Sequence, residues 1–264
     1  MPLFVVATPI GNLDEVSPRM KQVLLESNLV LCEDTRRTRA LFTALEIDAP
    51  KLVSCHAHNE SDRIHDVVRR LEQGENIALV SDAGMPGISD PGGYIVAAAH
   101  EHGMPVHVVA GPSSVVAAVA VSGFSGTPFH FLGFPPRKSG AIRKLLMEVS
   151  ALPGILVFLE SGRRIGKVIE VMSEVMPDRE AVICRELTKR YEEVIRGPVR
   201  GLPTVEQRGE VVLVVGPGEA VVESVQDVGP DLKAIAGALA ARWGCKKREA
   251  YNQLLKLEQQ RDET

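Results

Sequence analysis

The sequence lacks any long hydrophobic run. Nowhere in its 264 residues is there a stretch close to the roughly 18 uninterrupted apolar residues that a membrane helix needs. The N-terminal segment MPLFVVATPIGN has neither a basic start nor a small-residue cleavage site, so it does not have the pattern of a signal peptide. We therefore expect no association with a membrane.

Cysteine and aromatic residues are also scarce, and basic residues do not outnumber acidic ones. The four cysteines, Cys32, Cys55, Cys184 and Cys245, form no CxxC pair, which favours reduced, buried thiols and a cytoplasmic location. Thirty basic and 34 acidic side chains give a net charge of −4, and only 4% of residues are aromatic. Any binding of nucleic acid must therefore use local basic patches and few base-stacking contacts.

Several well-known catalytic signatures are absent. The sequence has no GxGxxG after a strand, no GxxxxGK[ST], no HExxH and no GxSxG, and the segment GRRIGK at 162–167 has the wrong spacing for a phosphate loop. These absences argue against a dinucleotide-binding enzyme, a P-loop NTPase and an α/β-hydrolase.

Short apolar runs alternate with amphipathic helical segments up to residue 216. Because most of these runs are continuous, they predict strands that are covered on both faces in a largely parallel sheet. Ser17 and Pro18 predict a helix start, and Ser61 or Asp62 predicts the start of a helix that ends at Gly74. The runs are 3–7, 29–32, 77–81, 106–110, 129–133, 155–160, 181–184 and 211–216. This alternation predicts an α/β fold.

Prolines and glycines around 124–136 suggest a boundary between two parts of the fold. We expect an N-terminal α/β domain at 1–120 and a second α/β domain at 121–220, with FLGFPPRK as a hinge or inter-domain strand. The remaining residues, 221–264, predict a small helical hairpin broken at Gly244. Its basic segment RWGCKKR at 242–248 suits either a nucleic-acid contact or a docking or dimerisation surface.

Three loops rich in glycine and proline follow predicted strands. They are ATPIGNL (7–13), SDAGMPGISDPGG (81–93) and AGPSS (110–114). Ligands bind at the carboxyl ends of strands in open α/β sheets, and glycine lets the backbone approach a ligand closely. We therefore expect a ligand site here, with Asp82 and Asp90 as hydrogen-bond acceptors.

Two polar segments offer further candidates. SCHAHNE (54–60) groups Cys55, His56, His58 and Glu60, but no further ligand is nominated elsewhere, so we predict no metal site and a loop whose histidines line a pocket. EDTRRTR (33–39) suits either phosphate binding by arginine or a solvated strand end, and RKSGAIRK (137–144) is a similar basic group.

Taken together and in this order, the motifs are specific. ATPIGNL, CEDTR, HNE, SDAGMPGISDPG, GPSS, LGFPPRK, LESGRR, ELTK with its following EE, and RGE span about residues 3–218. This set resembles the ribosomal RNA small-subunit methyltransferase I family of the tetrapyrrole-methylase (class III) superfamily. One departure is Gly162 in LESGRR, where a proline is commoner in the family.

The resemblance implies S-adenosyl-L-methionine bound in a cleft between two α/β domains, and a homodimer. It also implies 2′-O-methylation of a cytidine ribose in the decoding region of 16S rRNA, in the small ribosomal subunit. Carried onto this sequence, the cofactor-binding residues are Pro9, Gly11, Asp82, Ala83, Gly84, Pro86, Ile88, Ser113, Ser114, Leu159, Leu187, Gly209 and Glu210.

Removal of the ribose proton needs a base or a cation near the hydroxyl. The catalytic candidates are Lys189, Glu186, His56 and Asp34, with Arg36 as a phosphate or ribose anchor. Two alternatives stay open: a small-molecule tetrapyrrole (precorrin-type) methyltransferase on the same scaffold, and a non-catalytic binding module in ribosome assembly.

Overall fold

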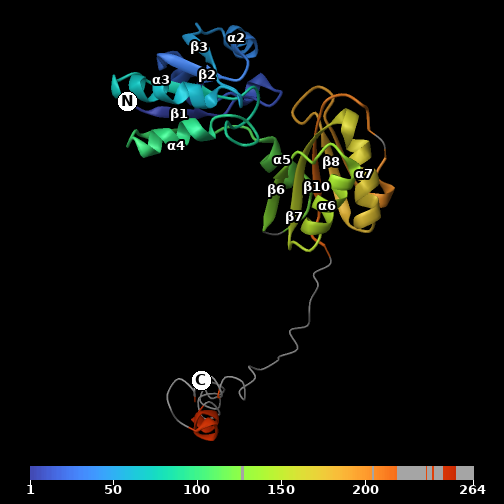
Figure 1. Ribbon diagram of the computed structural model, residues 1–264. Helices are drawn as coiled ribbons and strands as arrows, with labels where there is room; N and C mark the ends of the chain where they lie inside the picture. Colours follow the sequence, from blue (N-terminus) through green and yellow to red (C-terminus); the bar gives the residue numbers. More distant parts are fainter. Residues whose placement is uncertain (126–127, 204, 219–235, 237–239, 241–245, 254–264) are drawn as a thin grey trace. The chain divides into compact units, whose positions relative to one another are not determined.

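The computed structural model describes residues 1–125, 128–203, 205–218, 236, 240 and 246–253 (Figure 1). Residues 1–218 form one compact unit, and residues 219–264 are a second unit. In the second unit, Ala236, Ala240 and 247–253 are helical and Lys246 is also described, whereas the other residues of the predicted hairpin, with Gly244 and most of RWGCKKR, lie outside the described residues. No helix in the described ranges is both long and apolar enough to cross a membrane.

The first sheet has five strands, all parallel, in the order β3-β2-β4-β1-β5. Neighbouring residues along each central strand point to opposite faces, so both faces need apolar side chains. One face packs against α1 and α2, and the other packs against α3 and α4. The elements are β1 (Leu3–Val6), α1 (Pro18–Glu26), β2 (Leu29–Cys32), α2 (Thr35–Ala44), β3 (Lys51–Ser54), α3 (Glu60–Glu72), β4 (Ile77–Val80), α4 (Gly93–Glu101) and β5 (Val106–Val109), with a 3-10 turn at Leu13–Glu15.

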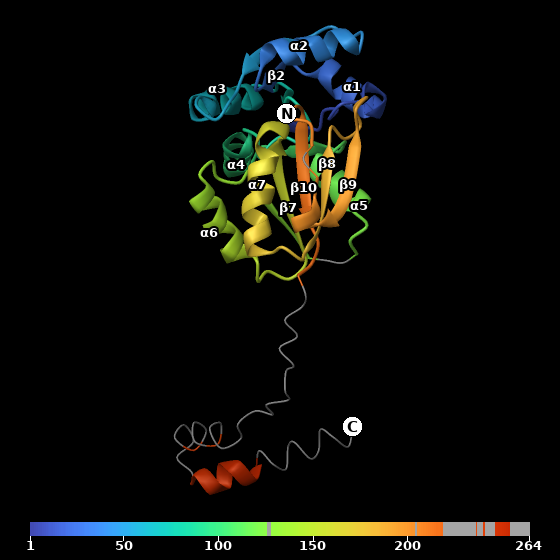
Figure 2. The ribbon, with the colours of Figure 1, turned by 90° about the vertical axis from the view of Figure 1, so that its right-hand side faces the viewer.

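The second sheet has the order β6-β7-β10-β8-β9, and only the β6–β7 pair is parallel. Helices α6 and α7 cover one face, and α5 covers the other (Figures 1 and 2). The elements are α5 (Ser114–Val121), β6 (Phe129–Gly133), α6 (Ser139–Val149), β7 (Ile155–Ser161), α7 (Gly162–Val175), β8 (Glu180–Arg185), β9 (Glu193–Pro198) and β10 (Glu210–Val215), with a 3-10 turn at Val199–Gly201.

The predicted α/β class is confirmed, but the largely parallel arrangement holds only for the first sheet. A parallel pair needs a crossover of about a dozen residues or more, whereas a short loop at 186–192 joins β8 to β9, which pair antiparallel. Strands β3 and β9 were missed because both lie at sheet edges: β9 alternates half-buried and exposed residues, and β3 is only half-buried.

The helix starts that the sequence predicted were correct in one case and wrong in another. Ser17 caps α1 as predicted, since its Oγ accepts a hydrogen bond from the backbone N–H of Met20 at 3.1 Å. The start predicted at Ser61 or Asp62 is wrong, because α3 begins at Glu60 and Asn59 occupies the N-cap position. Because the helix starts two or three residues earlier than predicted, Glu60 belongs to α3 rather than to the preceding loop, and its side chain is buried.

The chain passes from the first sheet to the second before α5. Val115 and Ala118 of α5 pack with Val157 of β7 and Val214 of β10. This packing supports a boundary near residue 112, and the division at residues 120 and 220 stays a prediction.

Segment FLGFPPRK is fastened to the second part of the fold. Its strand β6 pairs with β7. Arg164 of α7 donates to the carbonyl oxygens of Pro135 at 2.8 Å and Pro136 at 3.0 Å, and Lys167 donates to that of Arg137 at 3.1 Å. Anchoring of consecutive carbonyl groups to one helix is not the geometry of a hinge.

Candidate functional site

A cavity of about 300 Å³ is lined by loops from both sheets. The first sheet contributes the segments that follow β1, β2, β4 and β5, and the second contributes the ends of β7, β8 and β10 and the loops beside them. The lining residues are Ile10, Glu33, Arg37, Asp82, Ala83, Gly84, Met85, Ile88, Ser89, Asp90, Ser113, Ser114, Val115, Phe134, Leu159, Glu160, Cys184, Glu186, Leu187, Lys189, Glu210, Val211 and Val212. The three loops predicted to bind a ligand therefore converge on one cavity.

A second hollow of about 640 Å³ adjoins the first. The two share Glu33, Arg37 and Asp82, so these side chains form their common wall. The rest of the second hollow is lined by Asp34, Thr35, Arg36, Ser54 and His56. The site thus has two adjoining compartments, one more apolar and one lined by charged and polar side chains.

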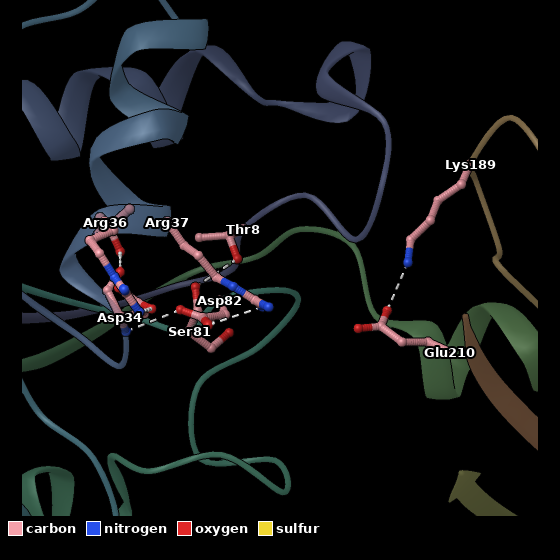
Figure 3. A network of polar contacts seen from close by, with 9 residues as sticks. Thr8, Asp34, Arg36, Arg37, Ser81, Asp82, Lys189 and Glu210 are labelled. Carbon is pink, nitrogen blue, oxygen red and sulfur yellow. Dashed lines mark hydrogen bonds and ion pairs between the residues drawn. The ribbon is translucent and has the colours of Figure 1, made fainter. Parts of the chain in front are cut away.

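The first two glycine-rich loops are fastened to each other. The backbone N–H of Thr8 donates to the carbonyl oxygen of Gly84 at 2.9 Å, and the N–H of Gly84 donates back at 3.1 Å. Thr8 also donates from Oγ1 to the carbonyl oxygen of Ser81 at 3.1 Å (Figure 3). Gly84 has φ +83°, a left-handed conformation that strongly favours glycine. These contacts fix the backbone that faces the cavity.

Asp82 connects the second loop to the start of α2. One carboxylate oxygen accepts from the backbone N–H of Asp34 at 3.2 Å, and the other lies 3.2 Å from Nη1 of Arg37 (Figure 3). Asp82 therefore aligns the wall between the two compartments, in addition to any contact with a ligand.

Asp34 and Arg36 form a close pair in the second compartment. The Asp34 carboxylate accepts from the backbone N–H of Arg36 at 2.8 Å and from its guanidinium at 3.1 and 2.7 Å (Figure 3). Hydrogen bonds from Arg36 hold the pKa of Asp34 well below its usual range. Asp34 is therefore poorly suited to act as a base, whereas the Arg36 side chain is 90% exposed and suited to an anion.

Lys189 is paired with two carboxylates at the rim of the first cavity. Its Nζ donates to Oε1 of Glu186 at 2.8 Å and to Oε2 of Glu210 at 2.9 Å (Figure 3 shows the second bond). Burial lowers the pKa of Lys189, but the hydrogen bonds to the two carboxylates outweigh burial, so its pKa is raised. Lys189 is therefore held as a cation, which disfavours a role as a base.

The Glu186 carboxylate is held by the same network. Burial raises its pKa, but the bonds from Lys189 and from the backbone N–H of Glu210, at 2.9 Å, lower it overall. Gly209 has φ +92°, and a Cβ there would lie 2.6 Å from Cγ of Glu186. A Cβ on Gly11 would meet the Lys189 side chain. Two of the predicted glycines thus make room for this network.

The predicted cofactor residues fall into two groups. Nine of them line the cavity: Asp82, Ala83, Gly84, Ile88, Ser113, Ser114, Leu159, Leu187 and Glu210. The other four, Pro9, Gly11, Pro86 and Gly209, are not among its lining residues. Of the catalytic candidates, Lys189 and Glu186 line the first cavity, and His56, Asp34 and Arg36 line the second. Their roles in binding and catalysis stay predictions.

Sequence reasoning missed several lining residues. Phe134 directly follows β6 and lies in the motif LGFPPRK, whereas Cys184 lies near the end of β8 and no motif separates it from residues of the core. The available signal for Phe134 was its place in that motif just after an apolar run, and the structure shows its side chain 58% exposed.

The segment SCHAHNE runs from the end of β3 through a turn to the start of α3, and its acidic residue has a structural role. Buried Glu60 accepts at Oε1 from the backbone N–H groups of Gly92 (3.0 Å), Tyr94 (2.7 Å) and Ile95 (3.2 Å), at the start of α4. Asn59 accepts from the N–H of His56 at 2.8 Å. Within the described part of the chain, no group of three or more His, Cys, Asp or Glu residues is placed to hold a metal ion.

Comparison with known proteins identifies the class. The family model of Tetrapyrrole (Corrin/Porphyrin) Methylases matches residues 2–203. Among solved structures, diphthine synthase has a TM-score of 0.63 at 14% identity over 81% of this chain and 89% of its own. Uroporphyrin-III C-methyl transferase from Thermus thermophilus, complexed with S-adenosyl homocysteine, has a TM-score of 0.57 at 19% identity over 81% and 96%. At these identities the likeness concerns the fold alone.

Comparison with relatives of known name shows which group within this class the chain resembles. Ribosomal RNA small subunit methyltransferase I of Leptospira biflexa is 42% identical over 73% of this chain and 80% of the relative. The protein of that name from Pseudomonas aeruginosa is 39% identical over 94% and 90%. The chain therefore belongs to the tetrapyrrole methylase family and, within it, to the ribosomal RNA small subunit methyltransferase I group, as its motifs indicated.

Proposed function

We propose that this methyltransferase transfers the methyl group of S-adenosylmethionine to the ribose 2′-hydroxyl of cytidine 1402 in the decoding region of 16S rRNA. The observation that carries the proposal is the convergence of the three family loops on one cavity, in a chain whose relatives are named rRNA methyltransferases. When bound, S-adenosylmethionine supplies an electrophilic methyl group on a positively charged sulfur.

The residues of the first cavity fit this cofactor. Six acidic residues line it, Glu33, Asp82, Asp90, Glu160, Glu186 and Glu210, against the two basic residues Arg37 and Lys189. This acidic surplus suits a ligand that carries a sulfonium and an ammonium group. Apolar side chains, including those of Ile88, Leu159 and Leu187, offer a surface for the adenine ring.

The second compartment suits the RNA backbone. Arg36 and Arg37 present guanidinium groups, which bind phosphate in a bidentate manner. His56 adds a buried Nδ1 that has no hydrogen-bond partner among the described residues. Because this compartment shares a wall with the first, a nucleotide held there lies next to the cofactor cavity, and alignment of the reacting atoms supplies much of the rate acceleration. The two arginines give a chain of net charge −4 local positive groups that RNA phosphates can contact, although the carboxylates of Glu33, Asp34 and Asp82 line the same compartment.

The test is acceptor specificity. The full chain is incubated with tritiated S-adenosylmethionine and either small ribosomal subunits from a strain that lacks this methyltransferase or a reduced uroporphyrinoid. We expect label in the 16S rRNA of those subunits and none in subunits from the parent strain, whose target is already methylated. Label in the tetrapyrrole would instead support the small-molecule alternative, and label in neither acceptor would support a non-catalytic binding module.

The proposal includes a homodimer and a cytoplasmic location. Val108 on the edge strand β5, and Val116 and Val121 on α5, are 55%, 59% and 51% exposed, which supports an interface with another chain. Cys32, Cys55 and Cys184 are free and buried, in keeping with a reducing compartment. Sedimentation equilibrium of the full chain should give twice the mass of 28.6 kDa, and a mass of one chain at micromolar concentration would contradict the dimer.

A further inference from the structure

The loop 186–192, which joins β8 to β9, has an unusual backbone for its residue types. Glu186 has φ +50° and Thr188 has φ +65°, so both lie in the left-handed region that favours glycine. Such conformations cost free energy and persist only where the surrounding contacts impose them. Here the backbone N–H of Lys189 donates to the carbonyl oxygen of Glu186 at 3.0 Å, and that of Glu192 donates to Lys189 at 3.1 Å. The loop is therefore held in one shape.

This loop lies beside the first cavity and against the first glycine-rich loop. Glu186, Leu187 and Lys189 line the cavity. A Cβ on Gly11 would lie 3.0 Å from Oγ1 of Thr188, so the two loops are in close contact. The residues that follow Lys189 in the chain therefore start from the rim of the cavity.

Tyr191 is an aromatic residue that this loop leaves exposed. Its side chain is 66% exposed in a chain of which only 4% is aromatic, and it lines neither compartment of the site. A tyrosine ring has few rotatable bonds, so on a fixed loop it presents a flat apolar face at a small cost in conformational entropy. Such a face is suited to a flat partner.

Arg190 adds a cation beside this ring. Its guanidinium carbon lies 5.7 Å from the centre of the Tyr191 ring, a distance typical of a cation–π contact. Arg190 is exposed and forms no ion pair within the described ranges. The carboxylates that follow have other partners, since Glu192 accepts from a backbone N–H of the same loop and Glu193 pairs with Arg185 at 2.9 Å. An exposed ring and an exposed cation thus lie next to each other.

A ring and a cation in this arrangement suit single-stranded RNA. Every unpaired base has a flat face that stacks on an aromatic side chain, and a guanidinium binds the phosphate that follows it. In a base-paired helix the neighbouring base pairs cover these faces, so the ring selects an unpaired segment.

We propose that Tyr191 stacks on an unpaired base of the RNA substrate and that Arg190 binds a phosphate of the same strand, an inference that rests on the proposed function. The stacked base is not that of the methylated nucleotide, because Tyr191 lines neither compartment. Lys189 at the rim and Tyr191 outside it belong to the same fixed loop, so a strand held at Tyr191 is also positioned relative to the cavity. No covalent bond forms or breaks in this step.

The test measures equilibrium binding of the full chain to small ribosomal subunits from a strain that lacks this methyltransferase. We expect Tyr191→Ala to weaken binding by about 5- to 150-fold, the range that alanine replacement gives for one stacked base. Tyr191→Phe keeps the ring and should bind within about twofold of wild type. Tyr94→Ala is the matched control and should bind as wild type, because Tyr94 is 70% exposed in α4 and lines neither compartment.

The salt dependence of binding separates stacking from attraction between charges. Tyr191→Ala should leave the slope of log binding constant against log salt concentration unchanged, since a stacked base releases no counterions. Arg190→Gln should make this slope shallower by about 0.7, the value for one phosphate contact of a single strand. Lys51→Gln removes an exposed cation at the start of β3, outside both compartments, and should leave the slope as in wild type.

A photocrosslink identifies the partner of Tyr191. The full chain with p-benzoylphenylalanine in place of Tyr191 is irradiated in complex with the small subunits, and the crosslinked species is analysed for RNA and protein. We expect a crosslink to 16S rRNA. A crosslink to a ribosomal protein or to a second copy of this chain, or none to RNA, would overturn the inference.

Three binding results would also overturn it. An affinity of Tyr191→Ala for subunits within about twofold of wild type would exclude the stacked base. An equal loss in Tyr191→Phe would assign the contact to the hydroxyl group, and an equal loss of calorimetric affinity for S-adenosylhomocysteine would show that Tyr191 supports the loop. These results leave the proposed function intact, whereas a wild-type chain that places no label in RNA would refute the proposed function and this inference with it.

Discussion

Glu60 is the residue whose replacement should damage this fold most clearly through hydrogen bonding. Glu60 is 4% exposed, and its carboxylate accepts hydrogen bonds from three backbone N–H groups at the start of α4, those of Gly92, Tyr94 and Ile95. These are the donors that a helix start leaves without partners, and a negative charge there is also favoured by the helix dipole. The perturbation is Glu60→Ala, with Glu60→Gln as a milder change.

The magnitude follows from these contacts. Hydrogen bonds to a charged group contribute about 1.5–3 kcal/mol each, and a buried donor left without a partner costs about 1–3 kcal/mol. The N–H groups of Gly92 and Ile95 are buried and that of Tyr94 is partly buried. Such losses are not additive, so we expect Ala to lower the free energy of unfolding by about 3–5 kcal/mol. Gln keeps an acceptor oxygen but loses the charge, so we expect a loss of about 1–2 kcal/mol.

The assay is urea denaturation of the full chain, followed by circular dichroism. Glu72→Ala is the control, because Glu72 is an exposed residue at the far end of the same helix α3, and it should change stability by less than about 0.5 kcal/mol. Glu60→Gln should also raise KM for S-adenosylmethionine, since the loop fixed at Gly92 lines the cavity. A loss of less than about 1 kcal/mol in Glu60→Ala would refute the assigned role.

Four further predictions concern the site and the tail. Gly209→Ala should cost about 1–3 kcal/mol of stability and slow methyl transfer, because φ is +92° and the new Cβ would displace a carboxylate; unchanged urea midpoint and turnover would contradict this. Lys189→Ala should slow methyl transfer more than it weakens cofactor binding, and unchanged turnover would remove Lys189 from the mechanism. Burial raises the pKa of Cys55 to about 11 and of Cys184 to about 12, so neither thiol should react with Ellman's reagent at pH 8 until urea unfolds the chain; rapid reaction of either would contradict its burial. Deletion of 225–264 should abolish binding to small subunits and preserve cofactor binding, and intact subunit binding would exclude the tail as the RNA contact.

The sequence predicted the central strands and the loops that meet at the cavity, because both have strong local signals. A strand buried on two faces is continuously apolar, as in Leu29–Cys32, and a ligand loop of this kind is dense in glycine and proline, as in 81–93. The edge strands lacked such a signal. Glu193–Pro198 alternates half-buried and exposed residues and carries both charges, so it lacks the continuous apolar run of a buried strand.

The parts of the site that were not predicted depend on long-range pairing. The role of Glu60 at the start of α4, 32 residues further on, is set by tertiary packing, and the segment HNE alone predicted only a loop beside a pocket. Likewise, four carboxylates of the cavity pair with cations from distant segments or neighbouring loops, namely Asp82, Glu160, Glu186 and Glu210. The spacing of residues within a motif does not predict which side chains from distant segments pair with each other.

The position of the transferred methyl group tests the central claim most directly. Small-subunit RNA labelled by the full chain is digested to nucleosides and analysed by mass spectrometry, and the labelled RNA is also treated with alkali. The account predicts one 2′-O-methylcytidine per subunit and one phosphodiester bond that resists alkali at that nucleotide, since the 2′ oxygen can no longer attack the phosphate. A methyl group on a base, with complete alkaline cleavage, would contradict it.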